Sequence, residues 1–185
     1  MNLSEQLDDA RSGSTAAQKY LFDLLADPMM AVCCRYVKNR ADAEELLLDG
    51  FYKFFSHLAE FRYQGEAALY AWIKTIMVRQ CLMFLRRRHA FSVVRADGDT
   101  EEVSCDSDAL SALSAAEIFD LIVQLPVGYR TVFNLYVMEG MEHKEIARAL
   151  DIAEGTSRSQ LNKAKQLLQK MLLQKGVQYV KRKNR

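Results

Sequence analysis

Residues 142–171 read EHKEIARALDIAEGTSRSQLNKAKQLLQKM, and this pattern predicts two helices joined by a tight turn. Ile146 and Leu150 recur at the spacing of one buried helix face. Asp151 follows where such a turn needs a residue that tolerates the left-handed conformation. A second helix starts near 154–156. The pattern indicates either a helix-turn-helix that binds DNA or a packed helical hairpin.

The outer face of the second helix favours DNA. At 100° per residue, its apolar side chains cluster on one side. The opposite side, which includes Gly155 and Ser159, carries two cations, three small polar groups and no acid. Side chains suited to base edges in a major groove are Arg158, Asn162 and Gln166. Side chains suited to phosphates beside the helix N-terminus are Thr156, Ser157 and Lys163.

Composition predicts an all-α protein, because only two prolines and eight glycines occur and half of the residues are hydrophobic. No apolar run approaches the ~20 residues of a membrane span. The N-terminus is polar and acidic, which excludes an ordinary secretory signal. The cysteines lack metal-ligand spacing, so we expect reduced thiols in a cytoplasmic protein without metal or cofactor. They are Cys33, Cys34, Cys81 and Cys105.

The net charge is only +1, but basic and acidic residues are concentrated in separate blocks of the sequence. Residues 62–91 carry six basic and one acidic side chain, and residues 141–185 carry eleven and four. The block between them, 92–140, carries two basic and nine acidic side chains. Two basic blocks indicate either two surfaces that meet a polyanion or ordinary solvated helix faces.

The chain from 15 to 90 is continuously helix-like. Asp27 followed by Pro28 predicts one helix start. Asp42 to Glu45 resembles a capping box and predicts a helix to about 58. A third long helix is expected over 67–88.

Two small helical domains follow from this pattern. Residues 92–112 are acidic and poor in large apolar side chains, which indicates a flexible linker or else an ordered surface loop. Helical periodicity resumes at about 113 and continues to about 174. We therefore expect domains at 1–91 and 113–185, the second containing the helix-turn-helix.

The helix expected at 67–88 mixes aromatic and basic side chains. Trp72, Thr75, Arg79 and Arg86 share one stripe. The segment before it adds Arg62, Tyr63, Gln64 and Gly65. Aromatic rings beside cations suit single-stranded DNA, because bases stack on rings and cations hold the backbone. Core packing of the tryptophan, and stabilisation of a helix C-terminus by the last arginines, are the alternatives.

Three groups of motifs resemble one family, the extracytoplasmic-function (ECF) RNA polymerase sigma factors of the sigma-70 family. Asp42-Ala-Glu-Glu-Leu46 with Asp49 and Phe51 resembles their polymerase-binding helix. Trp72 and the apolar helix ending in Leu85-Arg86-Arg87 resemble their −10 helix. Leu125-Pro126, Tyr129–Phe133, His143–Ala147 and Glu154–Ser159 resemble their −35 domain. The resemblance covers about 15–172.

The resemblance implies a bacterial transcription initiation factor that is not an enzyme. Its N-terminal domain would grip the β′ clamp helices of core RNA polymerase and capture unpaired −10 bases, with loop 64–68 holding a flipped base. Its C-terminal domain would sit on the β flap and read duplex −35 DNA with helix 154–170. Polymerase contacts are expected at Asp42, Glu45, Leu46, Asp49, Phe51 and Lys53.

Several positions depart from the family's usual residues. Leu48 and Gly50 stand where a polar and an apolar residue are common, and Arg79 stands where asparagine is common. Met83, Asp151 and Ala153 also differ. Arg79 adds a phosphate-seeking cation, so we hypothesise weaker −10 sequence reading and recruitment by another bound factor.

Two other function classes stay open. One is a DNA-binding regulator that acts without polymerase, and the other is an interaction protein that keeps the sigma fold without promoter use. An anti-sigma factor is a further partner that the family's habit suggests. An enzyme has almost no support, because His57, His89 and His143 lack partners at useful spacing.

Overall fold

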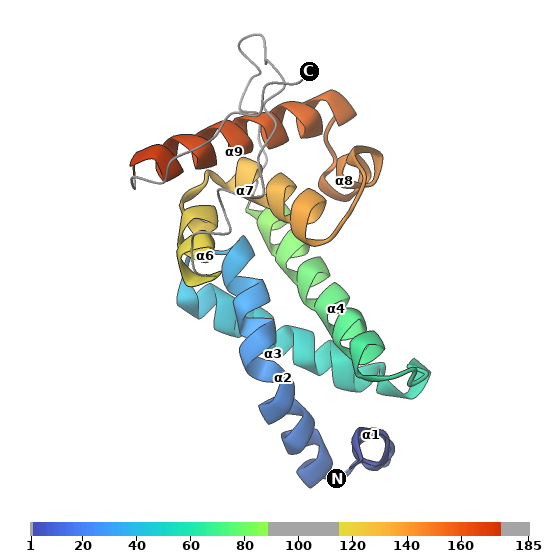
Figure 1. The fold of residues 1–185 in the computed structure, drawn as a ribbon. Helices are drawn as coiled ribbons and strands as arrows, with labels where there is room; N and C mark the ends of the chain where they lie inside the picture. The colour runs from blue at the N-terminus through green and yellow to red at the C-terminus, as the bar shows by residue number, and fades with distance from the viewer. Residues whose placement is uncertain (1, 89–114, 175–185) are drawn as a thin grey trace, which may run out of the picture. The chain divides into compact units, whose positions relative to one another are not determined.

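The computed structural model describes residues 2–88 and 115–174 (Figure 1), and every regular element in these ranges is a helix. This confirms the predicted all-α class. The predicted linker, 92–112, and the C-terminal tail lie outside the described residues. The chain divides into two compact units, Met1–Phe84 and Leu85–Arg185. The exact domain limits expected from the sequence stay a prediction.

The N-terminal unit is built from four α-helices and one short 3₁₀ turn. They are α1 (Leu3–Arg11), α2 (Thr15–Tyr36), α3 (Arg40–Ser56), η1 (Leu58–Glu60) and α4 (Glu66–Arg87). Apolar side chains from all four helices form one core, including Leu7, Leu21, Met29, Phe54, Ile73 and Met77. The sequence predicted a helix over 67–88. Helix α4 begins and ends one residue earlier than this, which confirms the prediction.

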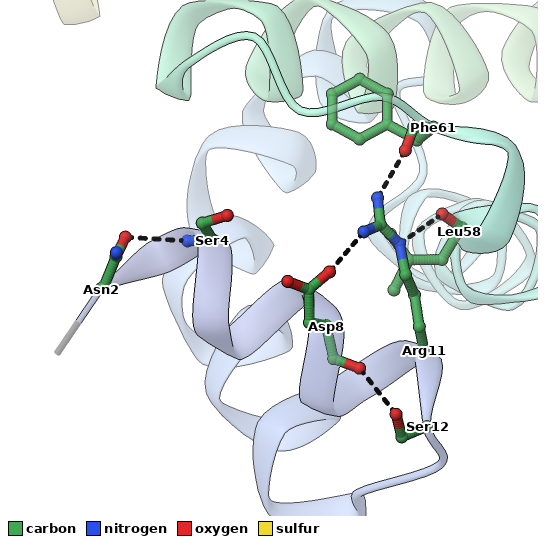
Figure 2. Close-up of polar contacts among 7 residues, drawn as sticks. All are labelled: Asn2, Ser4, Asp8, Arg11, Ser12, Leu58 and Phe61. Atoms are coloured by element: carbon green, nitrogen blue, oxygen red, sulfur yellow. Dashed lines mark hydrogen bonds and ion pairs between the residues drawn. The ribbon is translucent and has the colours of Figure 1, made fainter.

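Helix α1 was not predicted from the sequence. Asn2 caps its N-terminus by accepting a hydrogen bond from Ser4 N at 3.1 Å. Leu7 and Ala10 are buried, and Arg11 reaches across to Leu58 and Phe61 (Figure 2). Only two residues of α1 are buried, and the residues around them are polar. The helix therefore lacks the repeated apolar spacing by which the other helices were predicted.

The predicted helix start at Asp27 is wrong, because α2 runs through Pro28 from Thr15 to Tyr36. Its cap is Ser14, whose hydroxyl accepts from Ala17 N at 3.3 Å. Proline costs about 3 kcal/mol inside a helix. The continuous buried stripe of α2, on both sides of Pro28, offsets this cost.

Helix α3 begins two residues before the predicted Asp42 cap. Asn39 is the N-cap, and its side-chain oxygen accepts from Ala41 N at 2.8 Å and from Asp42 N at 3.2 Å. Asp42 instead lies in the first turn, where a carboxylate is favourable near the positive end of the helix dipole. Both residues are good caps, so the sequence alone did not distinguish them.

Gly50 lies at the centre of α3 because Met77 of α4 occupies the space of a side chain there. A Cβ atom at Gly50 would overlap Met77 Sδ and lie 2.7 Å from Met77 Cε. Both residues are buried. The departure from the family's usual residue at this position therefore has a packing reason.

The C-terminal unit contains α6 (Ala115–Gln124), α7 (Val127–Phe133), a short π-helix η2 (Asn134–Met138), α8 (His143–Leu150) and α9 (Glu154–Gln174). Arg130 of α7 is fully buried and ties α6 to α7. Its Nη1 donates to Val123 O at 3.0 Å and to Leu125 O at 3.1 Å. Burial lowers the pKa of this guanidinium, because it removes water from the charge.

One described helix, α4, is long and apolar enough to cross a membrane by length and composition alone. The expectation that no apolar run approaches this length is therefore wrong for α4. Of its apolar window, 44% is buried inside the protein, and core helices of soluble proteins pass the same test. Within the described residues, no group of three or more His, Cys, Asp and Glu side chains could hold a metal ion.

The contact between Gly50 and Met77 can be tested by a double-mutant cycle. Gly50→Ala gains up to about 1 kcal/mol of helix propensity but overpacks Met77, which costs roughly 1–3 kcal/mol. We therefore expect net destabilisation in the native background. In a Met77→Val background the Sδ position is empty, so Gly50→Ala should stabilise. Urea unfolding of the four proteins measures both effects, and equal effects in the two backgrounds would contradict the packing account.

Candidate nucleic-acid and partner interfaces

The predicted helix-turn-helix is present as α8 and α9. Glu142 N donates to Glu145 Oε2 at 2.8 Å and thereby closes the start of α8. Asp151 ends the helix in the left-handed conformation, with φ 55° and ψ 50°, as its position in the sequence predicted. The turn is therefore closed without glycine, and α9 starts three residues later at Glu154.

Most predicted −35 residues lie on the accessible side of α9. Arg158 and Gln166 are exposed, and four others are half-buried: Thr156, Ser159, Asn162 and Lys163. The opposite side, with Leu161, Ala164, Leu168 and Leu172, packs into the core of the unit. The predicted inner and outer sides of α9 thus match its burial.

Ser157 is the exception, because its side chain is fully buried. His143 Nδ1 and Ser157 Oγ form a hydrogen bond of 2.9 Å between α8 and α9. Tyr136 stacks on the His143 ring, with ring centroids 4.7 Å apart. Burial and the neighbouring Arg158 lower the pKa of His143, since both disfavour the charged ring. Ser157 therefore joins the two helices, and its hydroxyl does not face the surface where a phosphate would lie.

An acidic residue stands beside the basic face of α9. Glu154 Oε1 accepts a hydrogen bond of 2.6 Å from Arg158 Nη2, one turn along the helix. Both side chains are exposed, so this pair adds little stability. The expectation of an acid-free face is therefore too simple, because the carboxylate of Glu154 pairs with Arg158 beside this face.

Gly155 is exposed on the same side, and no protein atom lies within 4 Å of a Cβ built there. Glycine lowers helix stability relative to alanine by roughly 1 kcal/mol in a helix interior. Among the described residues, no side chain fills this space, so packing there does not require glycine at this position.

A cavity of about 660 Å³ opens in the N-terminal unit between the α3–η1 region and α4. Its lining includes four of the predicted −10 residues, Arg62, Gln64, Trp72 and Arg79. It also includes three polar residues for which sequence reasoning predicted no DNA contact, His57, Glu60 and Gln80. Four predicted −10 residues do not line it, namely Tyr63, Gly65, Thr75 and Arg86.

Lys53 also lines this cavity, although the sequence resemblance assigned it to polymerase contact. Its neighbour Tyr52 lies on the exposed side of α3. Successive residues of a helix are about 100° apart, so Lys53 projects in another direction, toward the cavity. The signal that was missed is its spacing of four residues from His57, which lines the same cavity. Lys53 and His57 therefore lie with the −10 residues.

Trp72 serves both the core and the cavity. Its ring is half-buried and stacks on Phe61, with centroids 4.5 Å apart and an interplanar angle of 11°. It also contacts Phe54, at a centroid distance of 5.2 Å. The two alternatives considered for this residue, core packing and an accessible ring, are therefore compatible.

The predicted polymerase-binding residues divide between two sides of α3. Leu46 and Phe51 are buried, and Phe51 packs against Phe22 with ring centroids 4.5 Å apart. They therefore belong to the core. Glu45 and Asp49 are exposed, and Asp42 is half-buried.

Two large residues missed by the sequence reasoning lie on the exposed side of α3. Leu48 is 60% exposed and Tyr52 is 75% exposed. With Glu45 and Asp49 they follow spacings of three and four residues, so the four side chains share one face. We call these four residues the α3 face. The helical spacing could have revealed this face from the sequence.

Comparisons with known proteins agree with the two-unit architecture. The family models for sigma-70 region 2 and for sigma-70 region 4 match residues 21–91 and 115–168. The ECF RNA polymerase sigma factor SigL of Mycobacterium tuberculosis is 30% identical over 173 residues, covering 90% of this chain and 97% of that protein. The ECF RNA polymerase sigma-E factor of Haemophilus influenzae is 25% identical over 185 residues, covering 90% and 96%.

Among solved structures, the sigma factor RpoE in complex with the anti-sigma factor NepR from Bartonella quintana is 20% identical. It covers 84% of this chain and 96% of that chain with a TM-score of 0.48, so this likeness carries no argument. The family assignment rests instead on the two family models and on the relatives that span nearly the whole chain. The chain belongs to the ECF sigma factors of the sigma-70 family, which direct RNA polymerase to promoters and start transcription.

Proposed function

We propose that this sigma factor acts through three separate surfaces, one for each step of promoter recognition. The α3 face binds core RNA polymerase, the cavity beside Trp72 captures unpaired −10 bases, and the N-terminal half of α9 reads duplex −35 DNA. The cavity is the observation that carries the proposal, because it combines an accessible aromatic ring with several cations.

The chemistry of the cavity suits a nucleotide. Within the described residues, Lys53, Arg62 and Arg79 have no carboxylate partner, so their charges are available to phosphates. Trp72 is half-buried and already stacks on Phe61, so a base can contact only the accessible part of its ring; a full stack on an aromatic side chain contributes about 1–3 kcal/mol per base. Gln64 and Gln80 on the lining can donate to and accept from a base edge. Double-stranded DNA would hide these base faces, so the occupant that fits is an unpaired strand.

The chemistry of α9 suits a major groove. Arg158 can form paired hydrogen bonds with guanine, and Asn162 and Gln166 can do so with adenine. Glu154 pairs with Arg158 at 2.6 Å, and this exposed ion pair must open before Arg158 binds guanine, at a small cost. Gly155 leaves room for the DNA backbone to approach the start of the helix.

The α3 face suits a protein partner. Leu48 and Tyr52 expose apolar surface beside the acidic Glu45 and Asp49. Tyrosine is one of the residues that contribute most binding energy when a partner covers them, and Leu48 adds apolar area beside it. The acidic flanks favour a basic partner surface, and we assign this face to the β′ clamp helices.

The remaining partner assignments rest on the family alone. We propose that the C-terminal unit sits on the β flap and that an anti-sigma factor or a recruiting factor covers the exposed surfaces of the free protein. Because polymerase and the chromosome are cytoplasmic, we infer that this protein works in the cytoplasm. The chemistry of RNA synthesis belongs to polymerase, and sigma factors are not enzymes.

The α3 face predicts that Leu48→Asp weakens binding to core RNA polymerase by roughly tenfold or more, the loss expected for one buried anchor. The fold should be unaffected, because Leu48 is exposed. Leu24→Asp, on an exposed part of α2, is the matched control and should bind normally. Competition with unmodified protein for core polymerase measures the change. Equal binding by both variants would remove Leu48 from the polymerase contact.

The position of Gly155 predicts a loss of DNA binding without a loss of stability. Gly155→Gln should keep or raise the melting temperature, because the new side chain meets no protein atom and improves helix propensity. Transcription from promoters that depend on a −35 element should fall about tenfold, the effect of roughly 1.4 kcal/mol. Lys170→Gln, which removes an exposed cation near the other end of α9, is the control. Normal transcription with Gly155→Gln would contradict this orientation of α9.

The whole proposal is tested by run-off transcription with core polymerase while −10 bases are changed one at a time. Because Arg79 offers charge where the family often has an amide, we expect losses below about fivefold at each position, less than the usual 1–3 kcal/mol per mismatch. Arg79→Asn should sharpen the losses and reduce the salt dependence of binding by about 0.7 in the log–log slope. Sharp losses with unmodified protein would overturn the weak −10 reading. Absence of discrete start sites would instead favour the recruited or non-initiating alternatives.

A further inference from the structure

Arg11 joins α1 to the segment that leads into the cavity (Figure 2). Its Nε donates to Leu58 O at 3.1 Å, its Nη2 donates to Phe61 O, and its Nη1 pairs with Asp8 Oδ1 at 2.5 Å. Only 26% of its side chain is exposed. One guanidinium thus bridges two carbonyl groups at the two ends of η1. Helix α1 precedes both stretches that match the sigma-70 family models.

One of the two carbonyl groups belongs to Phe61, which lines the cavity, and the other belongs to Leu58, a core residue three positions earlier. Leu58 begins η1, and Phe61 follows its last residue. The Phe61 ring stacks on Trp72 at 4.5 Å, and both rings line the cavity. Holding Phe61 O therefore also restrains the ring that lies against Trp72.

This segment has little backbone support of its own. Phe61 N donates to Leu58 O at 3.3 Å, and the next bond along the described chain runs from Leu69 N to Gly65 O. Gly65 has φ 105°, a conformation that L side chains rarely adopt, and no protein atom lies near its Cβ position. Residues 62–64 are thus held mainly from their two ends, and Arg11 holds the end at Phe61.

We propose that Arg11 is a positioning residue for capture of unpaired −10 DNA. It fixes Phe61 against Trp72 and so keeps the cavity in the shape that accepts a base. The free energy for ordering the segment is then supplied on folding and is not taken from DNA binding. This inference rests on the proposed function of the cavity.

Substitutions of Arg11 and Asp8 separate charge from geometry. Arg11→Lys keeps the positive charge and can pair with Asp8, but a single ammonium cannot copy the planar fork that bridges two carbonyls. Arg11→Met removes the charge as well. Asp8→Asn removes the ion pair and leaves both carbonyl bonds, so it is the matched control.

The spectroscopic readout is Trp72 fluorescence, because Trp72 is the only tryptophan in the chain. In the free 185-residue protein, we expect Arg11→Lys and Arg11→Met to increase quenching of this emission by acrylamide, while Asp8→Asn stays close to the unmodified protein. The functional readout is open-complex formation with core polymerase. Binding of each variant to core polymerase and to duplex −35 DNA is measured as the control. Both Arg11 variants should form open complexes about tenfold less well, with core and duplex binding unchanged.

Three outcomes would overturn the inference. Unchanged open-complex formation in both Arg11 variants would show that the segment keeps its shape without Arg11. Equal defects in Asp8→Asn would assign the effect to general docking of α1. Equal losses of core and duplex binding would indicate a defect in folding. A separate Trp72→Ala variant tests the proposed function itself: if it forms open complexes normally, the cavity does not capture DNA at all.

Discussion

The seating of Met77 on Gly50 is the constraint on which the N-terminal unit depends. A side chain at Gly50 would require the end of the buried Met77 side chain to shift, so glycine here allows α3 and α4 to approach with Met77 in its present position. The same two helices line the cavity, with Lys53 from α3 and Trp72 and Arg79 from α4. The proposed DNA site therefore inherits its geometry from a contact that never reaches the surface.

At two of the three proposed surfaces, contacts inside the protein support a side chain that is accessible to DNA. Trp72 contacts Phe54 in the core and lines the cavity with its accessible part. In the C-terminal unit, the hydrogen bond between buried Ser157 and half-buried His143 joins α9 to α8, and Arg158 is exposed one residue later. Rigid support of this kind reduces the entropy that a recognition side chain loses on binding.

The departures from the family's usual residues gain different explanations. Gly50 has a packing reason, and Asp151 adopts the left-handed conformation that its position requires. Leu48 is exposed on the α3 face and so adds apolar surface where a partner can cover it. Arg79 and Met83 both line the cavity, where they alter its charge and shape. Nothing in the structure explains Ala153.

The sequence by itself determined the all-α class, the helix-turn-helix, the inner side of α9 and the family, because these depend on local periodicity and on short motifs. It did not reveal α1, whose apolar face is only two residues wide, and it placed the start of one helix at Pro28 because cap signals are local. Only the tertiary structure decided which residues of α3 face outward. Leu46 and Leu48 are equally apolar, and packing against the other helices buries one and leaves the other exposed. Tertiary packing likewise buried Ser157 and brought Lys53 to the cavity, since these placements depend on neighbours far away in the chain.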